Sequence, residues 1–220
     1  MEEVPELLLI DKPKGITSFD VIRRLRRTLN IKKMGHAGTL DPLATGLMII
    51  GVGPGTKKLT ELVKLDKEYI AEVRIGESRT TGDLEGEIIE SKKVEGVTSE
   101  DVEGALKAMI GTLELPVSAY SAIKVDGVPM YKRARKAEKT GDVVTDVPMR
   151  LMRVDEAVLV SYKLHNEQAV AEVRFFVGSG TYIRSLAEEL GRRLGYPATL
   201  QNLRRTKVGT FDIKDAQTLG

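Results

Sequence analysis

The sequence predicts an α+β protein, a mixed and mostly antiparallel sheet with flanking helices. Segments with the alternation or the short apolar runs typical of strands outnumber those with helical apolar spacing. The two kinds are interleaved without the regular strand-helix repeat of a parallel α/β fold. A length of 220 residues suits one large domain, or two small lobes on a shared sheet.

The N-terminal part predicts a strand, a helix, a loop and a second strand. Leu7–Ile10 is a short apolar run that ends at the turn sequence KPKG. Glycines and a proline make residues 35–46 irregular, and Leu47–Val52 reads as a strand. The helix between them is predicted by apolar residues three and four apart, namely Val21, Ile22, Leu25 and Leu29.

The middle of the chain predicts a hairpin and two helices. Tyr69–Ile75 alternates as a strand, and the turn sequence TTGDLEG after it predicts a partner strand near Ile88. A helix is predicted to begin at Ser99, with Gly111 just past its end. A short basic helix is expected over residues 132–136, followed by an exposed connection over residues 138–148.

The C-terminal part predicts a strand and a helix. Val170–Val177 alternates as a strand, and the sequence GSGT after it is a turn. The helix, closed by Gly195, has an apolar stripe of Ile183, Leu186, Leu190 and Leu194.

Composition excludes several classes of protein. Apolar residues make up 41% and charged residues 30%, as in ordinary globular proteins. The chain has no cysteine, which excludes disulfides, thiolate metal sites and cysteine nucleophiles, and its two histidines predict no histidine-rich metal site. No apolar run approaches the roughly 20 residues of a membrane helix. The acidic N-terminus MEEVPELLLIDKP lacks the basic start of a secretory signal, so we expect a cytoplasmic protein.

Basic residues are clustered although the net charge is only +2. Between Asp11 and Lys33 there are eight Lys or Arg and two acidic residues. A second cluster comprises Arg192, Arg193, Arg204, Arg205 and Lys207. Such clusters can neutralise nucleic-acid phosphates, and solvated helix faces explain them equally well.

The most unusual stretch is GHAGTLDPLATG, residues 35–46. It holds a lone His36 and a lone Asp41 in irregular backbone, where rigid loops often place functional side chains. A tight turn in which Asp41 only caps the backbone is the equal alternative.

Other motifs are weaker on their own. GVGPGTKK, residues 51–58, lacks the spacing of a phosphate-binding loop and predicts a turn that leads into a helix. In GTYIRSLAEELG, residues 180–191, Tyr182 alone would be a core residue and Arg184 a surface charge. YSAIKVDGVPMYKRAR, residues 120–135, interleaves aromatics with cations as nucleic-acid surfaces do, or forms a basic amphipathic helix. His165 is expected to be a surface residue.

Together and in this order, these segments resemble the TruB family of pseudouridine synthases. The matching pieces are LLLIDKPKGITSFDVI, GHAGTLDPLATGLM, KEY, YSAIK with YKRAR, GTYIRSLAEELG and LRRTKVGTF, between about residues 7 and 213. The chain departs from relatives in reading LELPVSA before Tyr120, in having Gly178 where a cysteine is frequent, and in stopping before the C-terminal PUA domain. Residues 1–220 are therefore expected to be a single catalytic domain.

The resemblance implies the pseudouridine synthase fold, in two lobes with a central RNA-binding cleft, and a cofactor-free, metal-free isomerisation. Asp41 would attack ribose C1′ of a flipped-out T-loop uridine of tRNA (position 55), through a covalent ester or a glycal. Arg184 would pair with Asp41, Tyr69 would stack on the base and assist loss of the C5 proton, and His36 would fill the vacated space. Tyr182 and Leu203 would line the base pocket, and Lys12 would support the site. The expected phosphate contacts are Arg23, Arg24, Arg27, Arg204 and Arg205.

The expected partner is the T arm of tRNA, bound by a monomer without guide RNA and without a membrane. Two alternatives remain open at this point. One is a guide-dependent enzyme of the dyskerin type, which shares the catalytic element. The other is an RNA-binding or RNA-folding module whose catalysis is secondary. Modification of an unmodified tRNA transcript without guide RNA would separate them.

Overall fold

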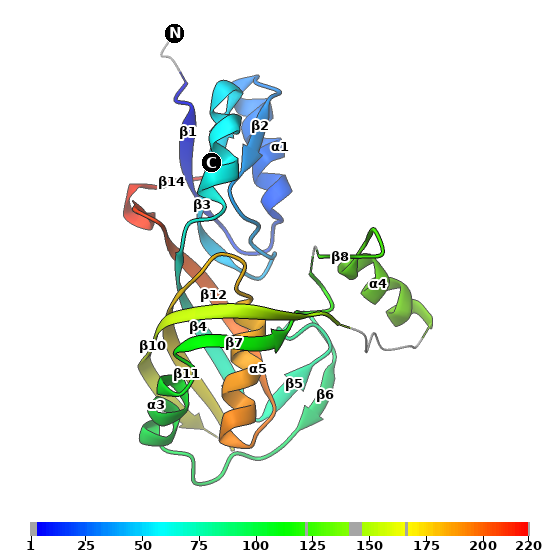
Figure 1. Ribbon diagram of the computed structural model, residues 1–220, viewed down its shortest axis with the longest axis vertical. Coiled ribbons are helices and arrows are strands. Elements are labelled where there is room, and N and C mark those ends of the chain that lie inside the picture. The colour runs from blue at the N-terminus through cyan, green and yellow to red at the C-terminus, as the bar shows by residue number, and fades with distance from the viewer. Residues whose placement is uncertain (1–3, 122, 141–146, 166, 220) are drawn as a thin grey trace. The chain divides into compact units, whose positions relative to one another are not determined.

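The computed structural model describes residues 4–121, 123–140, 147–165 and 167–219 (Figure 1). Its contacts divide the chain into two compact units. The first comprises Met1–Ala71, Arg174–Gly180 and Asn202–Gly220, and the second comprises Glu72–Val173 and Thr181–Gln201.

The first unit brings the N-terminal third of the chain together with its C-terminal end. Its elements are β1 (Leu7–Lys12), α1 (Ser18–Leu29), β2 (Met34–His36), β3 (Thr45–Val52), the 3-10 helix η1 (Gly53–Lys58), α2 (Leu59–Leu62), β13 (Phe211–Asp212), the 3-10 helix η2 (Ile213–Asp215) and β14 (Gln217–Thr218). Strand β3 lies between β1 and β2, and α1 packs next to β2 (Figure 1). The turn and helix predicted for GVGPGTKK are confirmed by η1 and α2.

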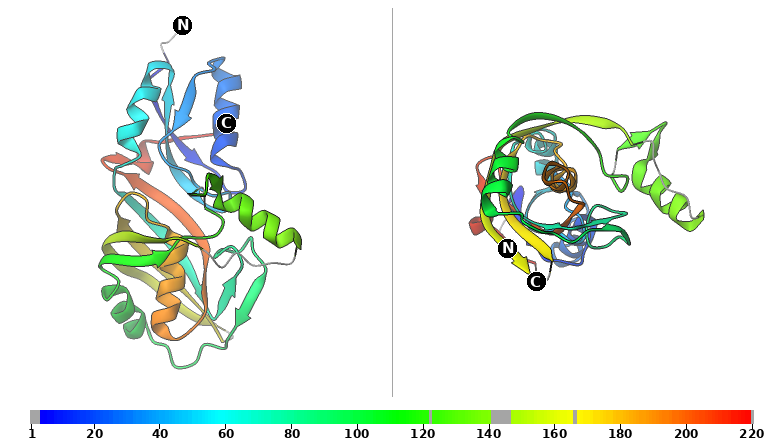
Figure 2. Two further views of the ribbon diagram at one scale, coloured as in Figure 1. Left: turned by 45° about the vertical axis from the view of Figure 1, so that its right-hand side comes forward. Right: turned by 90° about the horizontal axis from the view of Figure 1, so that it is seen from below.

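The second unit contains the middle of the chain. Its elements are β5 (Glu77–Arg79), β6 (Ile88–Ser91), α3 (Ser99–Lys107), β7 (Gly111–Pro116), β8 (Lys124–Val125), β9 (Val128–Pro129), α4 (Met130–Thr140), β10 (Met149–His165) and α5 (Ile183–Leu194). In the view from below, α5 lies inside the curve formed by the strands of this unit (Figure 2). Three strands have residues in both units: β4 (Lys67–Ile75), β11 (Gln168–Val177) and β12 (Ala198–Val208).

The predicted class, a mixed and mostly antiparallel sheet with helices, is confirmed. Within the described residues the main sheet has ten strands, in the order β14, β1, β3, β12, β4, β11, β10, β7, with β2 on β3 and β13 on β12. Antiparallel pairs include β1 with β3 and β10 with β7, while β1 with β14 and β12 with β3 are parallel. The parallel pair β3 and β12 matters for function, because it places a C-terminal strand beside the loop that carries Asp41.

Local signals explain where the helices begin and end. Thr17 and Asp20 form a capping box at the start of α1, and Thr98 and Asp101 form another at the start of α3. Gly195 ends α5 in the left-handed conformation, as predicted. Each of these contacts lies within four residues along the chain, so the sequence alone can specify it.

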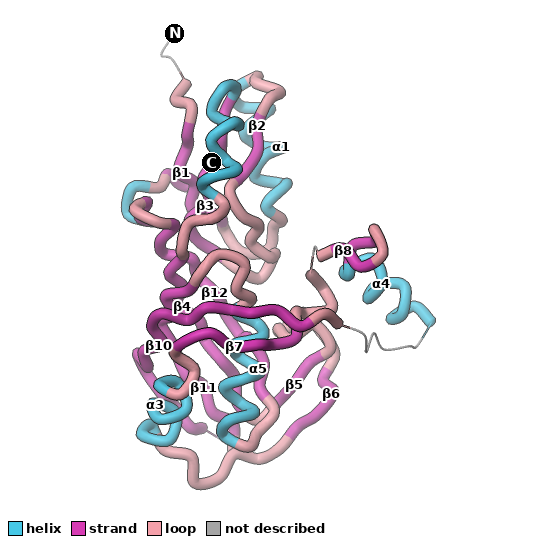
Figure 3. Tube along the Cα trace, in the orientation of Figure 1, coloured by secondary structure: helices cyan, strands magenta, loops and turns pink. Residues whose placement is uncertain are grey.

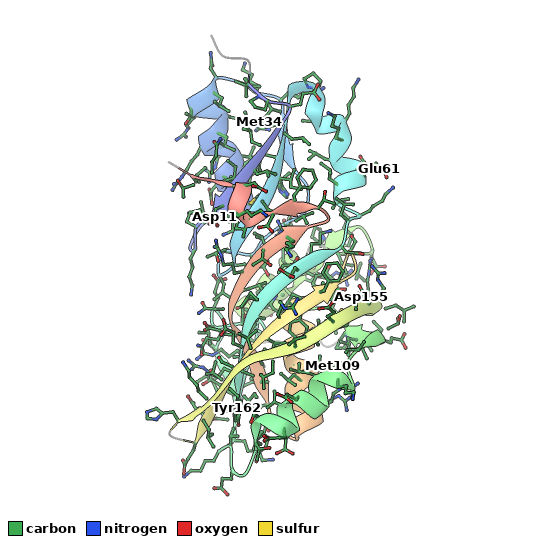
Figure 4. All side chains as sticks on the ribbon, turned by 90° about the vertical axis from the view of Figure 1, so that its left-hand side faces the viewer. Asp11, Met34, Glu61, Met109, Asp155 and Tyr162 are labelled. Carbon is green, nitrogen blue, oxygen red and sulfur yellow. The ribbon has the colours of Figure 1, made fainter. Side chains whose placement is uncertain are left out.

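Each unit has its own apolar core. In the first unit, Ala37, Leu47, Ile49 and Val208 are fully buried. In the second, α3 packs against α5, and each helix has buried leucines, among them Leu106 and Leu190. Tyr162 of β10, labelled in Figure 4, donates its hydroxyl to the Val97 carbonyl (3.0 Å) and so ties the segment before α3 to this strand.

Three sequence-based expectations are wrong. The stretch 35–46 is not irregular throughout, since Gly35 and His36 belong to β2 and Thr45 and Gly46 begin β3. Ile88 belongs to β6, which pairs with β5 in a separate two-stranded sheet, and not with the strand Tyr69–Ile75. The turn TTGDLEG closes a hairpin between its immediate neighbours, while both edges of β4 are taken by strands from later in the chain. Gly111 does not cap α3, since Ala108 is its C-cap and Gly111 begins β7.

Several strands of the described chain had no prediction. Among them are β7, β12 and the 17-residue β10, the long magenta strand of Figure 3. The burial of β10 does not alternate regularly, so it lacks the period-two signal. Helix α4 contains the predicted residues 132–136 and runs on to Thr140, while residues 141–146 of the expected connection lie outside the described residues. Within the described part of the chain, no helix is long and apolar enough to span a membrane.

Candidate active site

The loop between β2 and β3 carries Asp41, and hydrogen bonds hold the loop on both sides of it. The Ser18 hydroxyl donates to the Leu40 carbonyl (2.9 Å) and accepts from the Leu40 N–H (2.8 Å). On the other side, the Gly15 N–H donates to the Pro42 carbonyl (2.8 Å). Asp41 therefore lies between two residues whose main chain is bonded to Gly15 and to Ser18, the first residue of α1, and such backbone presents a side chain in a defined direction.

The segment from β1 to α1 can support the loop because its own turn is closed. Lys12 has no exposed surface, and its Nζ donates to the carbonyls of Pro13 (3.0 Å) and Ile16 (2.7 Å). Gly15 has a φ of +86°, which glycine adopts without strain. Lys12 thus closes this turn from inside, and its support of the site stays a prediction.

The far end of the loop lies against Arg205 of β12. The Arg205 side chain is buried, its Nε donates to the Leu47 carbonyl (2.8 Å), and its Nη2 donates to the Gly38 carbonyl (3.2 Å). Gly46 is paired with Arg205 in the register of β3 and β12. A side chain at position 46 would place its Cβ 2.3 Å from the Arg205 carbonyl oxygen, and φ there is +108°, so the position requires glycine.

Arg204, the preceding residue of β12, is paired with Asp11 of β1, which is labelled in Figure 4. Its two terminal nitrogens donate to the two carboxylate oxygens at 2.7 and 3.1 Å. Phosphate contact was predicted for both arginines. The buried guanidinium of Arg205 contacts main-chain carbonyls, and this placement argues against phosphate contact for Arg205. For Arg204, whose side chain is 42% exposed, phosphate contact stays a prediction.

Tyr69 lies on β4, on the same face as a buried lysine. Burial alternates along this strand, which places Lys67 and Tyr69 on the buried face, with Tyr69 8% exposed. The Lys67 Nζ donates to the carbonyls of Val63 (2.6 Å) and Leu65 (2.5 Å). Burial, and after it the positive charge of Arg205, lowers the pKa of Lys67 to about 8.

His36 ends β2 and is half-buried. Burial, and after it the charge of Arg205, lowers the pKa of His36, against a smaller opposing effect of a hydrogen bond with the Gly38 backbone. The imidazole is therefore neutral at pH 7. Its Nδ1 is buried and has no hydrogen-bond partner among the described residues.

Arg184 lies in the first turn of α5, in the second unit, and is buried. Its Nη1 donates to the Thr81 carbonyl (3.0 Å) and the Ser118 hydroxyl (2.8 Å), and its Nη2 donates to the Tyr120 carbonyl (3.3 Å). Considered alone, Arg184 was predicted to be a surface charge, and this prediction is wrong. Three acceptors hold its guanidinium in one orientation.

Asp83 is a residue that the sequence reasoning missed. Its carboxylate lies 3.8 Å from the Arg184 guanidinium, and Asp83 is 3% exposed. The Thr81 hydroxyl (2.6 Å) and the Glu85 N–H (3.1 Å) donate to it. TTGDLEG has the composition of an ordinary turn, and no sequence signal distinguishes this aspartate from an ordinary turn residue.

Tyr182 and Leu203 were predicted to line the base pocket, and both are half-buried. Tyr182 is the N-cap residue of α5, two residues before Arg184. Leu203 lies on β12, two residues before Arg205, and its carbonyl accepts from the Thr45 hydroxyl (3.4 Å). Their contact with a base stays a prediction.

The predicted site residues fall into two groups. The first unit holds Lys12, His36, Asp41, Tyr69 and Leu203, and the second holds Tyr182 and Arg184. The predicted pair of Asp41 and Arg184 joins the two units and stays a prediction.

Helix α1 exposes a basic surface in the first unit. Arg23, Arg24 and Arg27 are exposed, as predicted for phosphate contacts, although Arg23 is also paired with Asp20. The guanidinium groups of Arg23 and Arg26 lie 6.0 and 5.9 Å from the centre of the exposed Phe19 ring. The charge suits an RNA backbone, and contact with phosphate stays a prediction.

No cluster of three or more His, Cys, Asp or Glu able to hold a metal ion occurs among the described residues. A surface pocket of about 560 Å³ in the second unit is lined by α3 and the end of α5, including Asp101, Arg193 and Tyr196. It contains none of the predicted site residues.

Two family models match consecutive parts of the chain. The model described as TruB family pseudouridylate synthase (N terminal domain) matches residues 26–183. The model described as tRNA pseudouridylate synthase B C-terminal domain matches residues 184–220.

Individual proteins are similar over nearly the whole chain. A tRNA pseudouridine synthase B of Leifsonia xyli subsp. xyli is 44% identical over 97% of this chain and 70% of its own length. One of Opitutus terrae is 42% identical over 99% of this chain and 87% of its own length. A chain in the crystal structure of a Cbf5-Nop10-Gar1 complex aligns with a TM-score of 0.71 and 25% identity, over 97% of this chain and 52% of that one.

Proposed function

Because the chain belongs to the TruB family of pseudouridylate synthases, we propose that it converts the T-loop uridine of tRNA to pseudouridine with Asp41 as the nucleophile. Family membership makes the chain a tRNA pseudouridine synthase, an isomerase. The observation that carries the role of Asp41 is its loop. Asp41 is the one acidic residue between Gly38 and Leu47, and its neighbours on both sides are hydrogen-bonded to Gly15 and to Ser18 at the start of α1.

The reaction breaks the bond from N1 of uracil to ribose C1′ and makes a bond from C5 to C1′. A carboxylate that adds to C1′ lets N1 leave with the bonding electrons. After the base has turned, C5 bonds to C1′, the carboxylate leaves, C5 loses its proton, and N1 takes one up. Substrate and product are isomers, so the atoms and electrons balance without a co-substrate. The ester and glycal routes both place Asp41 at the ribose.

Tyr69 is assigned two tasks at the base. Its ring stacks on the uracil, and its hydroxyl assists removal of the C5 proton after the new bond has formed. The alternation of β4 supports this assignment, because it orients Tyr69 toward the interior of the first unit, on the same face as the buried Lys67.

The uridine must leave the stack of the RNA loop before a carboxylate can reach C1′, at a cost of a few kcal/mol. We assign to His36 the space that the base leaves. Its lowered pKa supports this role, because a neutral imidazole enters a base stack without the cost of desolvating a charge.

Arg184 is proposed to pair with Asp41 in the RNA complex. Its preorganised guanidinium, held by Thr81, Ser118 and Tyr120 next to Asp83, supports this role. An arginine fixed in this way keeps a neighbouring carboxylate ionised and aimed.

The proposal is tested with the purified chain and an unmodified tRNA transcript. We expect pseudouridine at the T-loop uridine without added guide RNA, mapped by carbodiimide treatment and primer extension. The control transcript carries cytidine at that position and should stay unmodified. Modification that depends on a guide RNA would support the dyskerin-type alternative, and binding without modification would support an RNA-folding module.

A further inference from the structure

We propose that Arg205 is a positioning residue for catalysis, because its buried guanidinium holds together both ends of the loop that presents Asp41. The inference rests on the proposed role of Asp41 as the nucleophile. It assigns a function to a side chain that was expected, from its place in a basic cluster, to contact phosphate.

The contacts of Arg205 bracket the loop. Nε donates to the carbonyl of Leu47, in the strand β3 that follows the loop, and Nη2 donates to the carbonyl of Gly38, near the N-terminal end of the loop. Asp41 lies between these two points. The planar fork of a guanidinium can serve two separate acceptors at once, whereas a lysine ammonium is a compact point donor on a flexible stem.

The backbone of the same residue strengthens the hold. Arg205 is paired with Gly46 where β12 runs parallel to β3, and a Cβ on Gly46 would be 2.3 Å from the Arg205 carbonyl oxygen and 2.7 Å from its nitrogen. At Gly46 the backbone of β3 therefore lies so close to the backbone of Arg205 that no residue with a Cβ atom fits at position 46. The side chain and main chain of Arg205 together contact one residue of the loop, Gly38, and two residues at the start of the following strand, Gly46 and Leu47.

The burial of Arg205 also argues for a specific role. The residue is 1% exposed, and its side chain donates hydrogen bonds to two main-chain carbonyls, those of Leu47 and Gly38. A buried cation satisfied only by carbonyls is costly to the fold. An apolar side chain of similar size would serve a purely packing role at lower cost, so we infer that the hydrogen bonds themselves are the reason for the arginine.

The positive charge of Arg205 lowers the pKa of two other residues of the first unit. It contributes to the lowered pKa of His36 and to that of Lys67, which precedes Tyr69 by two residues. Arg205 thus lies close to β2 and β4 as well as to the Asp41 loop. Its removal should loosen the geometry of the nucleophile while leaving the RNA-binding surface of α1 in place.

The test compares Arg205→Met and Arg205→Lys with the wild type in steady-state kinetics on tRNA. A displacement of about 1 Å at a reacting group costs on the order of 100-fold in rate, so we expect kcat to fall about 100-fold in Arg205→Met. Arg205→Lys, which keeps the charge and can reach one carbonyl, should lose about tenfold. KM should stay within about threefold of the wild type in both variants, because the RNA-binding surface is unchanged.

The control is Leu106→Ala, a buried residue of α3 in the second unit, which is expected to lower the melting temperature without changing kcat below the transition. A kcat within twofold of the wild type in a folded Arg205 variant overturns the inference, as does a loss of kcat that Leu106→Ala reproduces. If Arg205→Met does not fold, Arg205→Lys decides by the same criterion.

A second measurement follows His36 by NMR. Only two histidines are present, so His165→Gln assigns the His36 ring signal. Arg205→Met should raise the pKa of His36, and an unchanged value would contradict the placement of the guanidinium. Activity in Asp41→Asn would overturn the proposed nucleophile, whereas full activity in Arg205→Met with an inactive Asp41→Asn overturns the positioning role alone.

Discussion

The position of Asp41 is fixed by hydrogen bonds to the main chain of its two neighbours, Leu40 and Pro42. A serine hydroxyl binds both main-chain groups of Leu40, and a glycine N–H binds Pro42. Neither contact touches the carboxylate, so chemistry and positioning belong to different residues. A substitution of the carboxylate alone should therefore separate turnover from folding and binding.

We expect Asp41→Asn to lose at least about 10⁴-fold in turnover, because an amide is not a nucleophile toward ribose C1′. Fold and tRNA affinity should stay within about twofold of the wild type, since the side chain keeps its size. Pseudouridine mapping and filter binding measure the two quantities. Substantial product would remove Asp41 from the nucleophile role.

Tyr69→Phe should bind tRNA like the wild type and turn over about 10² to 10⁴ times more slowly. The ring can still stack on the base, but the hydroxyl that assists loss of the C5 proton is gone. Single-turnover rates at saturating enzyme measure the effect. A wild-type rate would leave Tyr69 with stacking alone.

At the scale of the element, α1 combines two tasks on opposite faces. Its first residue, Ser18, supports the Asp41 loop from inside, while its outer face carries exposed arginines. The capping box of Thr17 and Asp20 fixes where the helix starts, and therefore which residues fall on each face. The two tasks can be tested independently.

The double variant Arg24→Glu, Arg27→Glu should raise KM for tRNA about tenfold at 0.1 M salt and leave kcat within twofold. The slope of log affinity against log salt should become shallower, because fewer counterions are released on binding. Lys107→Glu, on the exposed face of α3, is the charge-reversal control at a site away from α1 and should change neither quantity. Equal effects of both variants would show that the arginines of α1 form a solvated helix face without a specific role in tRNA binding.

At the scale of the whole molecule, several cations are buried in the first unit, and one of them makes the stability depend on pH. The pKa of Lys67 is about 8 in the folded chain against an ordinary value of 10.5. Between these two values the unfolded chain binds a proton that the folded chain does not. Folding stability should therefore rise with pH across this window.

We expect the free energy of unfolding of the wild type, relative to that of Lys67→Met, to increase between pH 8 and about pH 10.5. Below pH 8 the difference should be constant, because the lysine is protonated in both states. Urea titrations of both proteins at intervals over this range measure it. Parallel curves for the two proteins would contradict the buried, destabilised ammonium.

Elements with a local signal could be predicted, and elements without one could not. The predictable elements are β4, with its alternation, α1 and α5, with their apolar stripes, and the left-handed Gly195. In each, the residues that carry the signal are only a few positions apart along the chain. The pairing of Ile88 was predicted wrongly and β10 was missed. Strand partners are set by residues far along the chain, and irregular burial removes the period-two pattern.

The fold class and the loop that carries Asp41 can be predicted from the sequence, and the motifs identify the family and its reaction. The distant side chains that hold this loop, and the carboxylate that accompanies Arg184, become visible when the chain is folded. The carbonyls that Arg205 binds are 158 and 167 residues away in the chain, and every residue has a carbonyl, so such a contact leaves no mark on its acceptor. A buried positioning arginine and a surface arginine therefore look alike until the strands are paired.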